Sequence, residues 1–148
     1  MPVELDFKLV LSTKDGKSYQ KEIKGDAAEP LMRKRIGETV TGDAIGFSGY
    51  EFVITGGSDK AGFPMRKGIQ ERRKQIMVSG GVGFKGNKRF LNKKKNTRKQ
   101  KGLLRRRTVC GEMVDITTRQ VNLKVTKEGA QPLGEAPAAE GEAAPAAE

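Results

Sequence analysis

Apolar and polar residues alternate at the start of the chain, the pattern of a strand with one buried face. Every odd position from Val3 to Leu11 is apolar. The segment Lys14–Lys17 follows and contains an Asp-Gly pair, which between two alternating runs favours a β-hairpin. Residues 18–23 form the expected return strand. The chain is therefore predicted to open with two paired strands.

Strand patterns recur later in the chain, separated by glycine-rich segments. Residues 50–55 are rich in aromatic and β-branched residues, and the Gly56-Gly57 pair is expected to end that strand. Residues 75–79 form another short run. Further strands are expected within residues 109–116 and at 121–125. At least six short strands are thus predicted.

One short helix is predicted between the second and third of these strands. Asp26 is a candidate capping residue, apolar residues continue to Ile36, and Gly37 is placed to end the helix. Pro30 is compatible only with the first turn. With many glycines and little helix, the predicted fold class is mainly β: a small antiparallel barrel-like domain with one short helix.

Two segments depart from globular composition. Residues 85–107 carry twelve basic residues, no acid and no clear period, so a long, extended basic loop is expected between strands. Residues 130–148 are rich in Ala, Glu and Pro, with Leu133 the one large apolar residue, so a disordered acidic tail is expected. The predicted division is a β-rich domain at 1–129 and this tail.

The charge of the chain is unevenly distributed. The 148 residues carry a net charge of +11. Residues 60–107 hold 18 basic residues and a single acid, Glu71, whereas residues 1–59 hold 8 basic and 10 acidic residues. A basic cluster of this kind is the electrostatic footprint of a nucleic-acid-binding protein.

Composition excludes many other functions. The chain has no His, no Trp and one Cys, which rules out imidazole-based catalysis, His or Cys metal sites and internal disulfides. Asp6, Asp15, Asp43 and Asp59 are expected in turns and at exposed strand positions, without a catalytic pair. No catalytic residue, metal, cofactor or small-molecule substrate is therefore predicted. No run approaches the about 20 apolar residues of a membrane span, so no membrane partner is expected.

Three local motifs have ordinary structural explanations. Gly81–Gly86 spells GxGxxG, but no helical pattern follows and Arg106 stands where an acid is needed, so we interpret it as a glycine turn. Gly16-Lys17-Ser18 lacks the upstream glycine of a phosphate-binding loop. Cys110, although near three arginines, is expected to be a small buried strand residue rather than a reactive thiol.

The basic middle of the chain supplies the candidate RNA-binding residues. Clustered Lys and Arg gain affinity by neutralising phosphates and releasing counterions. Phe84 and Phe90 lie among them and can either stack on unpaired bases or pin the loop to the core. The candidates from this clustering are Arg72, Arg73, Lys74, Lys85, Lys88, Arg89, Lys93, Lys94, Lys95, Arg98, Lys99, Lys101, Arg105, Arg106 and Arg107.

Two stretches of sequence resemble a known family. Residues 54–69, ITGGSDKAGFPMRKGI, and residues 106–115, RRTVCGEMVD, continuing through 121–129, are similar in order and spacing to the archaeal and eukaryotic small-subunit ribosomal protein family "S six e". The resemblance covers about the first 129 residues. It implies a β-rich, non-catalytic protein of a cytoplasmic ribonucleoprotein, with small-subunit ribosomal RNA and other ribosomal proteins as partners.

The resemblance also implies roles for individual residues. Lys60, Arg66 and Lys67, together with Arg105–Arg107, are expected to face RNA, and Phe63-Pro64 is expected to be a structural anchor. Eukaryotic members continue into a basic helix with phosphorylated serines, whereas this chain ends in an acidic segment. Regulation by kinases is therefore not carried over, and the short form resembles archaeal members.

The function predicted from the sequence is that of a structural constituent of the small ribosomal subunit. The folded body is expected to dock, and residues 85–107 to thread into ribosomal RNA and become ordered. The alternative is an RNA-binding protein outside the ribosome, such as a ribosome assembly factor, which composition alone does not exclude.

Overall fold

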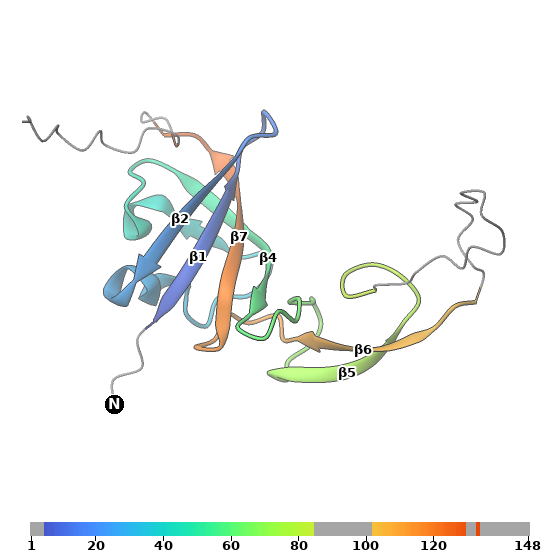
Figure 1. Cartoon of the computed structure of the whole chain (residues 1–148). Coiled ribbons are helices and arrows are strands. Elements are labelled where there is room, and N and C mark those ends of the chain that lie inside the picture. The colour runs from blue at the N-terminus through green and yellow to red at the C-terminus, as the bar shows by residue number, and fades with distance from the viewer. Residues whose placement is uncertain (1–4, 85–101, 130–132, 134–148) are drawn as a thin grey trace, which may run out of the picture.

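A computed structural model describes residues 5–84, 102–129 and 133 of the chain. Figure 1 shows a curled sheet with a two-stranded hairpin extending from one end. Two short 3-10 helices, η1 and η2, lie against the sheet. In chain order the elements are β1 (Asp6–Ser12), β2 (Ser18–Lys24), η1 (Gly25–Leu31), β3 (Thr39–Thr41), η2 (Gly42–Ile45), β4 (Glu51–Asp59), β5 (Arg73–Val78), β6 (Arg105–Cys110) and β7 (Thr118–Lys127).

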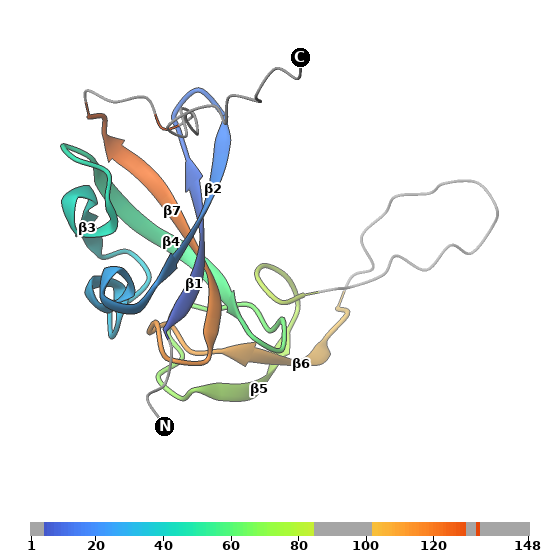
Figure 2. The same cartoon turned by 60° about the vertical axis from the view of Figure 1, so that its left-hand side comes forward.

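The main sheet has the strand order β2-β1-β7-β4-β3, and its curl is visible in Figure 2. The predicted mainly β, barrel-like fold and the opening hairpin are confirmed, with Phe7 opposite Ile23. The sheet is mixed rather than wholly antiparallel, because β1 and β7 run parallel, with Leu9 opposite Val121. This pairing joins the two ends of the folded chain, a crossover that local alternation does not reveal.

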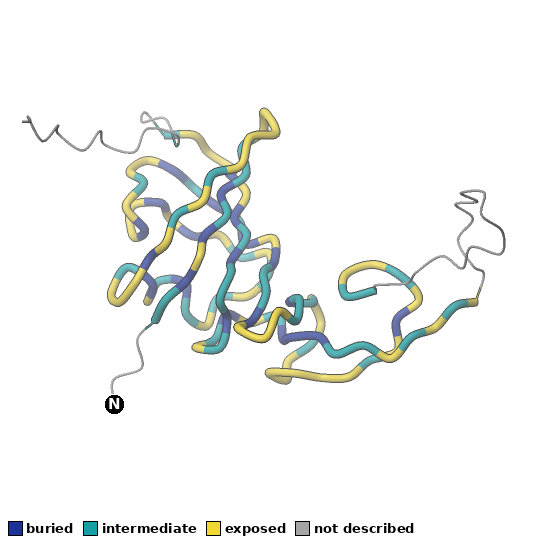
Figure 3. The backbone as a smooth tube through the Cα atoms, in the orientation of Figure 1, coloured by how far each residue is buried: buried dark blue, intermediate teal, exposed yellow. Residues whose placement is uncertain are grey.

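The hydrophobic core lies on the concave side of this sheet. Strand β1 contributes Phe7, Leu9 and Leu11, all fully buried, as the alternating pattern predicted. Figure 3 shows the buried positions alternating along the strands of the body. The other fully buried large side chains of the core cluster are Leu31, Ile45, Phe52, Ile54, Val114, Val121, Leu123 and Val125. Burial of each such side chain contributes about 1.5–3 kcal/mol, so this cluster holds the body together.

The single predicted helix is shorter and tighter than the pattern indicated. It is the 3-10 helix Gly25–Leu31, not a helix from 26 to 36, and Asp26 makes no capping bond. Pro30 lies inside it and has no N–H to continue an α-helical ladder. Arg33 then adopts a left-handed backbone (φ 64°), and its N–H donates to the carbonyl of Val114. Tertiary pairing thus replaces the second half of the expected helix.

The expectation that Gly56-Gly57 ends a strand is wrong. Strand β4 continues through both glycines to Asp59 and pairs with β7, with irregular register beside Gly56. A Cβ atom on Gly57 would lie 2.1 Å from the carbonyl oxygen of Gln120. Gly57 is therefore required where two strands approach closely. In the sequence alone, a glycine at such a close approach looks the same as a glycine that ends a strand.

Strands β5 and β6 form the projecting hairpin, which we call the arm together with residues 79–84. The strand expected at 75–79 is confirmed as β5, and it pairs with β6 in antiparallel register, Val78 opposite Arg105. Arg105–Arg107 were expected within the extended loop but belong to β6, because each pairs with a β5 residue. The rest of the expected loop, residues 85–101, lies outside the described residues.

The expected boundary at 129 lies close to the end of the described chain. The prediction of a disordered tail at 130–148 falls outside the described residues except at Leu133, whose side chain is half-buried against the core cluster. Within the described part of the chain, the helices are too short to cross a membrane.

Candidate nucleic-acid interface

The arm is joined to the body by a root, residues 59–72 and 111–117, that brings together the two family-like stretches. The end of β6 runs between residues 64–66 of the first stretch and Arg72, which precedes β5. On one side the N–H of Cys110 donates to the carbonyl of Pro64 at 2.9 Å, and the N–H of Arg66 donates to the carbonyl of Cys110 at 3.1 Å. On the other side the N–H of Gly111 donates to the carbonyl of Arg72 at 3.1 Å. The family-like residues therefore build the support of the arm.

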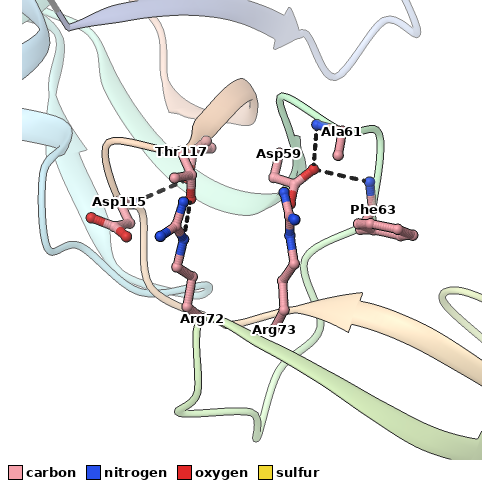
Figure 4. Close-up of polar contacts among 8 residues, drawn as sticks. Asp59, Ala61, Phe63, Arg72, Arg73, Asp115 and Thr117 are labelled. Carbon is pink, nitrogen blue, oxygen red and sulfur yellow. Dashed lines mark hydrogen bonds and ion pairs between the residues drawn. The ribbon is translucent and has the colours of Figure 1, made fainter.

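Asp59 connects the root to the first residue of β5. Its side chain is fully buried at the end of β4, and its Oδ2 accepts a 2.5 Å hydrogen bond from Nε of Arg73. Its Oδ1 accepts hydrogen bonds from the backbone N–H groups of Ala61 (2.7 Å) and Phe63 (3.2 Å), as Figure 4 shows. The Arg73 guanidinium also lies 5.2 Å from the centre of the Phe63 ring. One carboxylate thus fixes the turn after β4 and the start of the arm.

The environment of Asp59 favours its ionised form. Burial alone raises the pKa of this carboxyl, but the hydrogen bonds from Arg73, Phe63 and Ala61 together outweigh burial, so its pKa lies below the ordinary value. The expectation that Asp59 is exposed is therefore wrong. Strand β4 is longer than expected and ends at Asp59, so this residue lies at the junction between body and arm.

Glu112 stabilises the other side of the root. Its Oε2 accepts a 2.7 Å hydrogen bond from the N–H of Gly68, and its Oε1 lies 3.6 Å from a guanidinium nitrogen of Arg35. Its own N–H donates to the carbonyl of Ile69 at 2.8 Å. Residues 113–116, expected to be strand, form a single bridge between Met113 and Arg35 instead. Asp59 and Glu112 were not recognised from the sequence as supports of the arm. The available signal was that each is an acid close to an end of the basic segment 60–107.

The described structure holds half of the predicted RNA-binding residues. The nine in the arm and root are Lys60, Arg66, Lys67, Arg72, Arg73, Lys74, Arg105, Arg106 and Arg107. The nine outside the described residues are Lys85, Lys88, Arg89, Lys93, Lys94, Lys95, Arg98, Lys99 and Lys101. The described arm and root, residues 59–84 and 105–117, hold these nine cations and four acids, Asp59, Glu71, Glu112 and Asp115.

The nine described cations differ in how firmly the protein holds them. Lys60, Lys67 and Arg106 are exposed. Arg72 is also exposed, with its Nε 3.3 Å from Oγ1 of Thr117. A guanidinium nitrogen of Arg66 donates to the carbonyl of Val82 at 2.7 Å and so positions the glycine turn.

Arg73 and Lys74 have acidic partners within the protein. Lys74 lies 2.5 Å from a carboxylate oxygen of Glu71, and both side chains are about half exposed. Arg73, unlike Lys74, pairs with a buried carboxylate. The geometry therefore gives Arg73 a positioning role in addition to its charge.

The structure also places Cys110, the phenylalanines and the glycine turn that the sequence singled out. Cys110 is 3% exposed, and burial raises the pKa of its thiol, which favours the interpretation as a buried strand residue. Phe63 packs partly buried against the core, as expected of an anchor. The glycine turn is confirmed, with the N–H of Phe84 donating to the carbonyl of Gly81. Phe84 is half-buried, and Phe90 lies outside the described residues.

Comparisons with known proteins identify the family. Residues 7–137 match the family "Ribosomal protein S6e". "Small ribosomal subunit protein eS6" of Methanosphaera stadtmanae is 39% identical over 130 residues, 87% of this chain and 90% of its own length. The protein of that name from Archaeoglobus fulgidus is 37% identical over 134 residues, 88% of this chain and 95% of its own length. The chain therefore belongs to the ribosomal protein S6e family, the structural, non-enzymatic proteins of the cytoplasmic small ribosomal subunit.

Proposed function

We propose that the arm and root bind ribosomal RNA of the small subunit while the curled sheet serves as a rigid support. The observation that carries the proposal is the concentration of cations on a projecting hairpin: nine basic residues lie in its described arm and root. RNA phosphates are the partner that such a surface fits, because each neutralised phosphate releases condensed counterions.

The support of the arm adds to this argument. Cations on a flexible segment lose conformational entropy when they bind, and a preorganised surface avoids part of that cost. Here Asp59, at the end of β4, accepts a hydrogen bond from Arg73 of the arm. Glu112 of the root accepts one from Gly68 and pairs with Arg35 of the body. The arm is thus presented to its partner in a fixed orientation.

The segment 85–101, which lies outside the described residues, adds to the basic charge in sequence. It connects β5 and β6 beyond the glycine turn and carries nine further basic residues in sequence. We expect it to follow the RNA backbone and become ordered there, with phosphate contacts from Lys93–Lys95, Arg98 and Lys99. Neighbouring ribosomal proteins are expected to contact the remaining surface of the body. An assembly factor is the weaker alternative, because the family itself is one of ribosomal constituents.

Salt dependence of binding tests this function. In the variant Lys60→Gln/Lys67→Gln/Arg106→Gln, three exposed cations of the arm and root lose their charge. Affinity for transcribed small-subunit RNA is measured from low to high salt. Each lost phosphate contact flattens the log–log slope by about 0.7–0.9, so a decrease of about 2–3 is expected.

A matched variant controls for total charge. Lys14→Gln/Lys17→Gln/Lys124→Gln removes three exposed lysines of the sheet body, two in the β1–β2 turn and one on β7. Its log–log salt slope is expected to differ from the wild-type slope by no more than about 0.7–0.9, which is the contribution of one phosphate contact. Equal flattening by the two variants would contradict the proposal that the arm is the RNA-binding surface.

A further inference from the structure

One face of the arm is covered by the protein itself. In the antiparallel register, directly opposed residues share a face. Val78, Ile76 and Val109 lie on one face, which also carries Lys74, Arg105 and Arg107. Val109 is fully buried and Val78 is 2% exposed. The glycine turn lies over this face, since a Cβ on Gly83 would be 2.9 Å from a methyl carbon of Val109. The arm therefore has a small apolar centre of its own.

The opposite face is open along the outer part of the arm. It carries the opposed pairs Gln75–Thr108 and Met77–Arg106. At the inner end of this face, Arg73 and Cys110 turn onto the body. Further out, Gln75, Met77 and Arg106 are all exposed. This part of the arm, which extends away from the sheet in Figure 1, presents a flat two-stranded surface.

Large apolar side chains occupy this open face. Met77 is 61% exposed, and Leu104, which precedes β6, is 57% exposed. The alternation of an extended chain places Leu104 on the side of Arg106, two positions later. Met77 is thus the cross-strand neighbour of Arg106, and Leu104 precedes Arg106 by two positions on the same side. Apolar side chains exposed together on a strand surface indicate a contact that covers them.

The charge around the face identifies the occupant as a polyanion. Arg106 lies on this face, and the described arm and root hold nine basic residues against four acids, so the surface is complementary to RNA rather than to an apolar protein surface. Its described residues are aliphatic, amide, hydroxylic or basic, without the aromatic rings on which unpaired bases stack. Aliphatic side chains instead suit the C–H surface of riboses, and an Arg beside them can donate to 2′-hydroxyl and phosphate oxygens.

Groove dimensions select one RNA surface. The major groove of A-form RNA is too deep and narrow for side chains to read, whereas its minor groove is wide, shallow and lined by 2′-hydroxyls. The two strands of the arm are about 4.8 Å apart before side chains are counted, so they fit poorly in the about 6 Å minor groove of B-DNA. The major groove of B-DNA, about 12 Å wide, does admit a two-stranded ribbon, which makes a DNA duplex the competing probe. We propose that the open face, Gln75, Met77, Leu104, Arg106 and Thr108, docks in the minor groove of an A-form RNA duplex.

This inference rests on the proposed RNA-binding function and adds the class of RNA surface. Its test compares three probes at one salt concentration: an RNA duplex, a DNA duplex of the same sequence, and one RNA strand alone. The wild-type chain is expected to bind the RNA duplex about tenfold more tightly than either other probe. Met77→Ser/Leu104→Ser removes the apolar contacts without changing charge, so it is expected to abolish this preference and leave the salt slope unchanged.

A matched variant controls for loss of exposed apolar surface. Met113→Ser/Ile116→Ser changes two side chains that are each 40% exposed in the segment after β6, and the duplex preference is expected to remain. Circular dichroism of each variant establishes that its fold is intact. The salt slope is a second check on folding, because a folding defect would change the slope as well as the duplex preference.

Two results would overturn the docking proposal alone. These are equal wild-type affinity for the RNA and DNA duplexes, or an undiminished preference in the Met77→Ser/Leu104→Ser variant. The latter would assign the apolar face to a neighbouring protein. The arm would still be an RNA-binding element if Lys60, Lys67 and Arg106 set the salt slope. Wild-type binding to none of the probes and not to small-subunit RNA would instead overturn the proposed function itself.

Discussion

At the scale of single residues, the chemistry of this protein is concentrated in acids that hold basic residues in place. Asp59 is buried and accepts three hydrogen bonds, one of them from Arg73. A buried carboxylate without partners is costly, and this one is stable because the turn after β4 and the arm both supply donors. Arg73 is therefore both a cation of the interface and a structural link.

Replacing Asp59 by Asn should destabilise the junction of arm and body. The amide is nearly the same size but carries no charge, and its NH₂ group cannot accept from the donors that the carboxylate satisfies. We expect the free energy of unfolding to fall by about 1–3 kcal/mol, measured by urea denaturation at pH 7. Glu38→Gln, at a partly exposed ion pair with Lys34 (3.8 Å), is the control and should cost less than about 0.5 kcal/mol.

The pH dependence of this difference follows from the lowered pKa of Asp59. An unfolded Asp has a pKa of about 3.9. Because the folded pKa is lower, the stabilisation is fully present above the unfolded pKa and is lost as pH falls through the folded pKa. The stability gap between wild type and Asp59→Asn should therefore narrow below about pH 4. A gap that stays constant down to pH 2 would contradict the role of the charge.

At the scale of elements, the alternation of apolar and polar residues predicted the features that depend on neighbouring residues in the sequence. The alternation of β1 and the Asp-Gly turn predicted the first hairpin, and Phe7, Leu9 and Leu11 are buried as expected. The parallel pairing of β1 with β7 was not predictable, because it depends on two segments more than 100 residues apart. Charge clustering located the arm, whereas its root depends on contacts of Cys110 and Glu112 with distant segments.

Gly57 tests the close approach of β4 and β7. In Gly57→Ala the added Cβ would meet the Gln120 carbonyl oxygen at 2.1 Å, so the backbones must separate. We expect a loss of more than about 2 kcal/mol in the free energy of unfolding, since overpacking at a fixed site costs about 1–3 kcal/mol. The control is Gly62→Ala, because the space around Gly62 is open and only its positive φ opposes an alanine. This change should lower the free energy of unfolding by about 1–2 kcal/mol. Equal or smaller loss at Gly57 would contradict the close approach.

At the scale of the whole molecule, the structure divides into a body that holds the apolar core and a basic arm for which we propose RNA binding. The apolar core lies within the curled sheet, and the cations lie on the projecting hairpin and its root. This separation keeps the basic residues of the arm out of the apolar core. Both family-like stretches meet at the root, which fits the proposal that the root holds the arm in place for RNA binding.

Protein–RNA crosslinking in purified native small subunits tests this division most directly. After ultraviolet irradiation and digestion, the crosslinked peptides are identified by mass spectrometry. We predict that RNA crosslinks concentrate in residues 60–84 and 102–110, whereas the outer face of the sheet, with Lys8 and Lys124, yields few. Crosslinks concentrated on that outer face, with the arm free of them, would contradict the account of the arm as the RNA-binding element.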